Sequence, residues 1–160
     1  MSRLRSLLFA LAALLLLVSP AAAADNRNFG AHLNAEGAVV SLAQGQATFQ
    51  LSKDGESMSF RLIVANLHDT TQAHIHIAPA PGANGPVSVW LFPDAPPSTL
   101  IAGRFSGVLS TGTFTAADFV GPVLAGQDMD ALLTAIAEGR AYVNVHTSTN
   151  PGGEIRGTIR

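Results

Sequence analysis

Hydrophobic and polar residues alternate with a period of two through most of the chain. Between Ala47 and Leu51, for example, every second residue is apolar and the residues between them are polar. Successive side chains of a β-strand point to opposite faces, so this pattern is typical of strands with one buried face. The same alternation predicts further strands over residues 29–33, 58–64, 73–78, 87–92, 103–109, 141–147 and 154–160.

The segments between these strands predict turns, loops and one helix. Residues 53–56 place a glycine among charged residues, which favours the tight turn of a β-hairpin. Residues 79–86 and 93–99 are rich in proline and glycine, which end strands. Residues 128–139 instead place leucine and isoleucine on one helical face, with Asp128 as the cap at the start. We therefore expect an all-β fold, an antiparallel Greek-key β-sandwich or barrel with one short crossover helix.

The first 24 residues have the organisation of a signal peptide. Arg3 and Arg5 give a positive start, residues 7–18 form an apolar run, and small residues follow it. We expect a signal peptide over residues 1–24 and one domain over residues 25–160. The apolar run is short for a membrane span and no second one follows it, so the cleaved product is expected to be periplasmic or secreted, without a membrane span. The alternative is that the segment stays uncleaved as an N-terminal anchor.

Composition removes several classes of function. The 160 residues include no cysteine, which excludes disulfides, thiolate metal sites and thiol nucleophiles. Without Arg3 and Arg5 the chain has seven basic and eleven acidic residues, a net charge of −4, which argues against nucleic-acid binding. The sequence has no nucleophile elbow, no phosphate-binding glycine loop and no His-Glu-x-x-His motif. Because these motifs are absent, the sequence gives no motif-based reason to expect an enzyme.

Three histidines occupy matching positions in two predicted strands. In residues 73–77, His74 and His76 alternate with isoleucines, and in residues 141–147, His146 alternates with valines. The aliphatic side of each strand is expected to face the core, so all three histidines are expected on the outer, solvent-facing side. If the two strands are neighbours, the three imidazoles form one surface site.

Such a site suits copper, with zinc as the second choice. Imidazole nitrogens bind both ions, whereas calcium and magnesium prefer oxygen ligands. Three ligands leave a coordination position open to water or a small ligand. The alternative is that these histidines are only polar residues on wet strand faces. His32 and His68 carry less information, and we interpret His68 as a surface histidine rather than as a fourth ligand.

Three further polar residues are candidates for a supporting role around the ion. Asn144 lies on the histidine face of its predicted strand, and Glu154 and Arg156 share a face of the last strand. Each can orient a ligand imidazole or attract an anion. The alternative for Glu154 and Arg156 is simple pairing with charges on adjacent strands.

The sequence contains the motifs His74-Ile75-His76 and Asn84-Gly85-Pro86, and a C-terminal run that reads YVNVHT and, after two residues, NPGGEIRG. Together they resemble the CHRD domain, a family named from chordin that also occurs in exported bacterial proteins. The resemblance covers roughly residues 29–160. In chordin the domain belongs to a secreted growth-factor antagonist, and that partner is not expected for a small single-domain protein.

A fainter resemblance is to Cu/Zn superoxide dismutase, a Greek-key sandwich whose copper is held by a His-x-His strand and a histidine late in the chain. This resemblance implies that His74, His76 and His146 are copper ligands and that Arg156 guides an anion to the metal. The chain has no partner for the metal-bridging histidine, no zinc-site cluster and no cysteine pair. Only a copper-only relative of that enzyme fits.

These observations favour an exported copper-binding protein that buffers or transfers copper outside the cytoplasm. Its expected partners are the metal ion and an unidentified exported protein. Two alternatives stay open. One is a copper-only, superoxide dismutase-like oxidoreductase, in which copper cycles between Cu(I) and Cu(II) close to Arg156. The other is a metal-free extracellular module for protein binding or adhesion, as the role of chordin implies.

Overall fold

The computed structural model describes residues 27–35 and 37–160, and the expected signal peptide lies outside them. This part of the chain forms seven strands, two short α-helices and one 3₁₀ turn. Their bounds are β1 Asn28–Ala35, β2 Gln44–Leu51, β3 Ser57–Ile77, β4 Val87–Phe92, β5 Ile101–Thr115, the 3₁₀ turn Ala116–Asp118, α1 Gly121–Leu124, α2 Met129–Ala137, β6 Ala141–Thr147 and β7 Ile155–Thr158.

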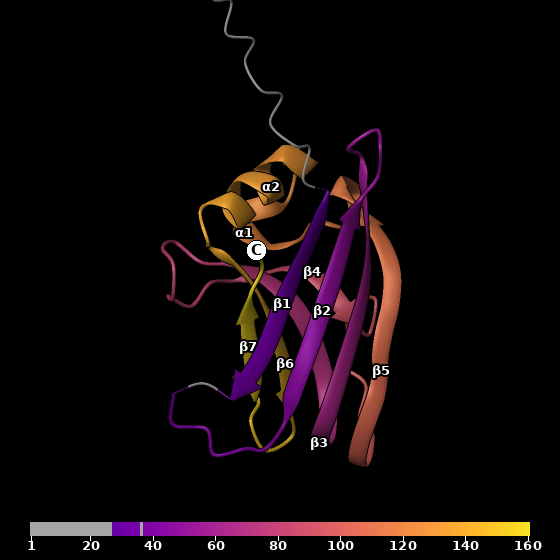
Figure 1. Ribbon diagram of the computed structural model, residues 1–160, viewed down its shortest axis with the longest axis vertical. Helices are drawn as coiled ribbons and strands as arrows, with labels where there is room; N and C mark the ends of the chain where they lie inside the picture. The colour runs from indigo at the N-terminus through magenta and orange to yellow at the C-terminus, as the bar shows by residue number, and fades with distance from the viewer. Residues whose placement is uncertain (1–26, 36) are drawn as a thin grey trace, which may run out of the picture.

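Five of the strands close into an antiparallel barrel (Figure 1). The order around it is β1, β2, β3, β6 and β7, after which β7 pairs with β1 again. β3, which has 21 residues, closes the ring because its first part pairs with β2 and its last part with β6. β4 and β5 are additional strands that also pair with β3. A single strand therefore contacts four others.

The inner faces of the strands form one hydrophobic core, as the alternation in the sequence requires. In the first half of β3, Met58, Leu62 and Val64 are buried, whereas Ser59 and Arg61 between them are exposed. The buried side chains stack inside the barrel because residues two apart along a strand share a face.

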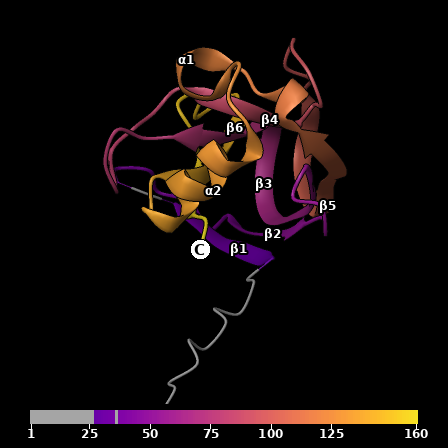
Figure 2. The same cartoon turned by 90° about the horizontal axis from the view of Figure 1, so that it is seen from above.

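The helices lie at the end of the barrel where β1 begins, and Figure 2 shows α2 over that end. α2 starts where the carboxylate of Asp128 accepts a hydrogen bond from the Ala131 N–H, which satisfies a free amide of the first turn. Its apolar face is buried through Met129, Leu132, Ala135 and Ile136. Among the described residues, no helix has the length and apolar composition needed to cross a membrane.

The predicted all-β antiparallel architecture is confirmed. The turn at residues 53–56 joins β2 and β3 as a hairpin, β4 and β6 have the predicted bounds, and the predicted helix 128–139 is α2. α1 and the 3₁₀ turn come in addition, and β5 is longer than the predicted strand 103–109.

One strand prediction is wrong, because the expected strands 58–64 and 73–78 are parts of the single strand β3. Asn66 and Asp69 between them have positive φ angles of 60° and 51°, which these residue types adopt more readily than most. Both are hydrogen-bonded to residues of β5, and the pairing of β3 with β5 continues past them with shifts of register. Polar residues typical of a loop therefore form the irregular middle of a long strand.

Candidate metal centre

Pairing between β3 and β6 places the three histidines on one side of the sheet. In this antiparallel register His74 is opposite Asn144, and His76 is opposite Tyr142. His146 follows Asn144 by two residues, so it projects from the same face of β6. The intervening Ile75 is fully buried in the core. The histidines thus lie opposite the aliphatic core, on two strands that are neighbours.

The predicted exposure of this face is wrong. His74, His76 and His146 expose only 1%, 7% and 6% of their surface, so the cluster is buried rather than a surface site. A period of two identifies the side of a strand on which a residue lies, but it carries no information about what covers that side. Here the cover comes from the segments that follow the two strands: the β3–β4 loop, β4 itself and the β6–β7 turn.

Each imidazole is covered by a different segment. The ring of Trp90 on β4 meets His74 edge-on, with ring centroids 4.3 Å apart and planes at 87°. The loop between β3 and β4 reaches His76, and the turn between β6 and β7 reaches His146. The barrel therefore has a second buried layer on this side, made of polar and aromatic groups.

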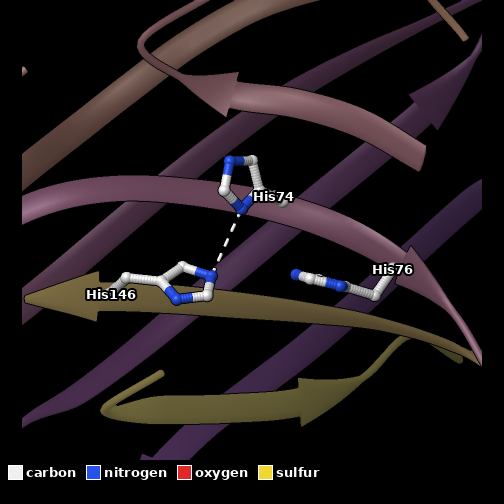
Figure 3. A group of neighbouring side chains, drawn as sticks. All are labelled: His74, His76 and His146. Atoms are coloured by element: carbon white, nitrogen blue, oxygen red, sulfur yellow. Dashed lines mark hydrogen bonds between the residues drawn. The ribbon is translucent and has the colours of Figure 1, made fainter. Parts of the chain in front are cut away.

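The three rings face one another closely enough to share an ion (Figure 3). The Nδ1 of His74 and the Nε2 of His146 are 3.2 Å apart. Taking one ring nitrogen from each of the three histidines, all the nitrogens lie within 4.8 Å of one another. Nitrogens bound to one ion at about 2 Å lie up to about 4 Å apart. A closing movement of about 1 Å therefore brings all three onto a single ion.

Two backbone carbonyls fix the orientation of two of these rings. The Nδ1 of His76 lies 3.0 Å from the Gly85 carbonyl oxygen, and the Nδ1 of His146 lies 2.9 Å from the Pro151 carbonyl oxygen. A carbonyl oxygen only accepts hydrogen bonds, so each Nδ1 carries the proton and each Nε2 keeps its lone pair. Such contacts hold metal-binding histidines in the required tautomer.

Burial keeps the cluster neutral. It lowers the pKa of His74 from 6.5 to about 3, helped by the nearby His146 and His76. It lowers the pKa of His76 to about 4, although the Gly85 carbonyl acts in the opposite direction. The pKa of His146 is also lowered by burial, against the effect of the Pro151 carbonyl. All three imidazoles are therefore free of an added proton at neutral pH, as metal ligands must be.

The donor set fits an ion that prefers nitrogen. The Nε2 atoms of His74 and His76 are buried and have no hydrogen-bond partner in the described part of the chain. An unpartnered buried nitrogen is costly, and the Nε2 of His76 is relieved if it binds an ion. The cluster consists of histidines alone, with no carboxylate or thiolate, so these three residues could hold a metal ion such as copper or zinc.

Asn144 borders a polar cleft beside the cluster. It exposes 8% of its surface, its Nδ2 donates to the Gly152 carbonyl at 3.3 Å, and its Oδ1 has no partner among the described residues. Gly153 allows this packing, because a Cβ there would lie 2.2 Å from Oδ1. The cleft has a volume of about 280 Å³, and its lining includes Asn84, Asn144 and Arg156.

Glu154 supports the turn that contacts His146. Its buried carboxylate accepts hydrogen bonds from Ser41 Oγ at 2.6 Å, Thr147 Oγ1 at 2.7 Å and Asn150 Nδ2 at 3.1 Å. Burial alone would raise the pKa of Glu154, but these hydrogen bonds outweigh it, and the pKa is lowered. The carboxylate joins neutral groups of two loops, so its role differs from the charge pairing considered for the sequence.

Arg156 is also engaged within the protein. Its guanidinium donates to Asn84 Oδ1 at 2.9 Å and to the Ala83 carbonyl at 2.6 Å. Its Cζ lies 3.4 Å from the centroid of the Tyr142 ring. That ring in turn stacks on His76, with centroids 5.0 Å apart and planes at 7°. Arg156 therefore acts on the cluster through an aromatic ring.

Sequence reasoning missed part of the environment of the cluster. Tyr142 shares a strand face with His146, and this parity is a signal that it lies beside the site. Trp90 carries no such signal, because its contact with His74 depends on the pairing of β4 with β3. His32 and His68 are exposed and lie outside the cluster.

The comparisons with known proteins place the chain in a family. A family model described as the CHRD domain matches residues 29–159. Neither the search of curated proteins nor that of solved structures found a match. The matched region contains all three histidines, the cleft and every strand from β2 to β7. The chain belongs to the CHRD domain family.

Proposed function

We propose that this protein binds one copper ion through His74, His76 and His146 and buffers or transfers copper outside the cytoplasm. The observation that carries the proposal is the convergence of three buried, neutral imidazoles whose nitrogens lie within 4.8 Å of one another. Two of them are held by carbonyl contacts at Nδ1, so that their Nε2 atoms carry the lone pairs, and the Nε2 of His146 lies 3.2 Å from the Nδ1 of His74. Export rests on the signal peptide expected over residues 1–24.

Copper is preferred over zinc because of the ligand set. For a given nitrogen site, divalent copper binds more tightly than zinc, and imidazole suits both ions. Three protein ligands leave a position to which a partner protein or a small ligand can add during transfer. The ion is the cargo in this proposal, and the chain supplies orientation, burial and a neutral ligand set.

Titration of the purified protein with copper and with zinc, read by calorimetry and by EPR of the Cu(II) form, tests the proposal. We expect one ion per chain, several nitrogen ligands in the EPR spectrum, and tighter binding of copper than of zinc. The matched variant carries His74→Ala, His76→Ala and His146→Ala and should lose this binding. No binding by the parent protein, or equal binding by the triple variant, would contradict the metal site and favour a metal-free binding module.

A dismutase-like activity is the second candidate, favoured by the positive charge of Arg156 near the cluster. This charge acts on His76 and contributes to lowering its pKa. A copper ion at the site would supply one-electron redox chemistry. Superoxide loss accelerated by the copper-loaded protein, and abolished by His146→Ala, would favour this candidate over a carrier, for which we expect little turnover.

A further inference from the structure

The loop between β3 and β4, residues 79–86, lies across the outer side of the histidine cluster. We refer to it as the strap. Its Gly85 contacts two groups of the site: the carbonyl meets Nδ1 of His76 at 3.0 Å, and the amide donates to the Tyr142 hydroxyl at 3.0 Å. A Cβ at Gly85 would lie 2.0 Å from the Ile77 carbonyl oxygen, so the strap is pressed against the end of β3.

Arg156 contacts the strap at two residues that precede Gly85. It projects from β7 and donates to the Ala83 carbonyl at 2.6 Å and to the Asn84 side chain at 2.9 Å. The same guanidinium covers the Tyr142 ring, with Cζ 3.4 Å from the ring centroid. One side chain thus joins the strap to the aromatic ring that stacks on His76.

The contacts of Arg156 depend on the shape of its side chain. A guanidinium is planar, so it can lie flat on an aromatic ring while its edge donates two parallel hydrogen bonds. A lysine ammonium has the same charge but is a compact donor without a flat face. Arg156 and Asn84 also line the 280 Å³ cleft that Asn144 borders, so the strap forms one wall of this cleft.

We propose that Arg156 latches the strap over the histidine cluster and thereby limits the rate at which a metal ion reaches and leaves the site. Arg156 is a positioning residue in this proposal, because it acts through Tyr142 and Gly85 rather than on the ion. The proposal rests on the proposed metal-binding function. It differs from anion guidance, in which the charge of Arg156 matters and its planar shape does not.

The test uses the purified, Cu(II)-loaded protein and measures copper release to excess EDTA, under conditions in which the rate no longer depends on EDTA concentration. We expect Arg156→Lys and Arg156→Ala to release copper about tenfold faster than the parent, the size of effect expected when charge-assisted hydrogen bonds are lost. The increase should be similar in both variants, since lysine retains the charge of Arg156 but not its planar shape. It should also be similar at low and high ionic strength, because the proposal depends on this shape and not on the charge.

The matched control is Arg140→Lys. Arg140 donates to the Ala78 carbonyl at 3.2 Å, just before the strap, and pairs with Glu138, so it is anchored in the same region without touching the aromatic stack described for Arg156. We expect this variant to release copper at the parental rate. A parental rate for Arg156→Lys combined with an altered, salt-sensitive rate for Arg156→Ala would overturn the latch in favour of charge guidance.

Amide hydrogen exchange on the metal-free protein gives a readout that needs no ion. We expect the Gly85 amide, which donates to Tyr142, to exchange at least tenfold faster in Arg156→Lys than in the parent and at the parental rate in Arg140→Lys. A parent that binds neither copper nor zinc would refute the proposed function. A parent that binds copper, with unchanged Gly85 exchange or unchanged release in Arg156→Lys, would overturn the latch alone.

Discussion

The two ends of strand β3 follow the same alternation but have different surroundings. At its start, Met58 and Leu62 face the core and Arg61 faces solvent. At its end, Ile75 faces the core in the same way, but His74 and its neighbours on the outer face are also buried. The first region has one buried face and one solvent-exposed face, and the second has two buried faces.

This difference shows how polar residues on the outer face of a strand become able to bind a metal ion. In the first region the outer side chains keep their contact with water. In the second region Trp90, the strap and the β6–β7 turn remove that water. Loss of water keeps the imidazoles neutral, and the pairing of β3 with β6 holds them close together, which is the state in which they can bind an ion.

The largest expected effect of this difference is a dependence of stability on pH. Below pH 6.5 the unfolded chain takes up protons on His74 and His76, whereas the folded chain does not until pH falls to about 3 and 4, respectively. Stability is therefore present above pH 6.5 and is lost as the pH falls toward these values. By pH 5 the loss amounts to about 2 kcal/mol for each of the two residues. Denaturant unfolding of the metal-free protein between pH 7 and pH 5 measures it.

The matched control for the pH experiment is a histidine on a solvent-exposed face. His32→Asn, at an exposed position outside the cluster, should leave the pH dependence of the metal-free protein unchanged. His74→Asn with His76→Asn should flatten it. An equal slope in the parent and in this double variant would contradict the assignment of the acid sensitivity to the buried pair.

Moving the His-x-His pair to the wet end of β3 sharpens the comparison. In the background of the triple alanine variant, Ser59→His and Arg61→His create the same spacing on an exposed strand face. We expect this pair to bind copper at least a hundredfold more weakly than the parent, a difference of about 3 kcal/mol, because it lacks the third imidazole and the fixed ring orientations. Calorimetric titration gives both affinities. Affinity equal to that of the parent would show that the buried surroundings contribute nothing.

Two carboxylates allow the same comparison outside the histidines. Glu154 is buried and accepts three side-chain hydrogen bonds, whereas Asp54 in the β2–β3 turn accepts hydrogen bonds in full contact with solvent. We expect Glu154→Gln to lower the free energy of unfolding by about 2 kcal/mol, because the buried hydroxyl of Thr147 and the half-buried amide of Asn150 lose their acceptor. Copper affinity should also fall about tenfold, because the turn that orients His146 is loosened.

Asp54→Asn is the control and should leave both the unfolding free energy and the copper affinity at the parental values. Thermal and denaturant unfolding with calorimetric titration of the three proteins decide the matter. Loss of stability in Glu154→Gln with unchanged copper affinity would limit Glu154 to a structural role.

The smallest perturbation uses the single tryptophan as a reporter. Trp90 touches His74, so Cu(II) bound at the cluster should quench its fluorescence at one equivalent, whereas Zn(II), which is not redox-active, should leave most of the emission. The triple alanine variant should show no quenching at one equivalent. Quenching of that variant equal to that of the parent would place the copper elsewhere.

Much of the fold could be predicted because it depends on local pattern. The alternation predicts β4 and β6 with their observed bounds, and the capping Asp128 and the apolar face predict α2. The merging of two expected strands into β3 could not be predicted, because Asn66 and Asp69 are typical of a loop. Pairing of β3 with the distant strand β5 continues past them and keeps them in the sheet.

The composition of the site could also be predicted, but its surroundings could not. Parity places His74 and His76 on one face, and a third histidine of matching parity lies at the end of the chain. The burial of this face depends on the strap, on Trp90 and on the turn at Pro151, none of which leaves a periodic signal in the sequence. The alternation along a strand therefore indicates which residues share a face, and tertiary contacts decide whether that face is buried.

The separation of the ligands along the chain has a consequence for folding kinetics. His74 on β3 and His146 on β6 are 72 residues apart, and they meet only when these two strands pair. The complete ligand set is therefore a property of the folded chain, and an ion that needs all three nitrogens binds after the slow, long-range step of folding. Bound copper would then slow unfolding and leave the folding rate unchanged, so that copper binds only to chains that have already folded.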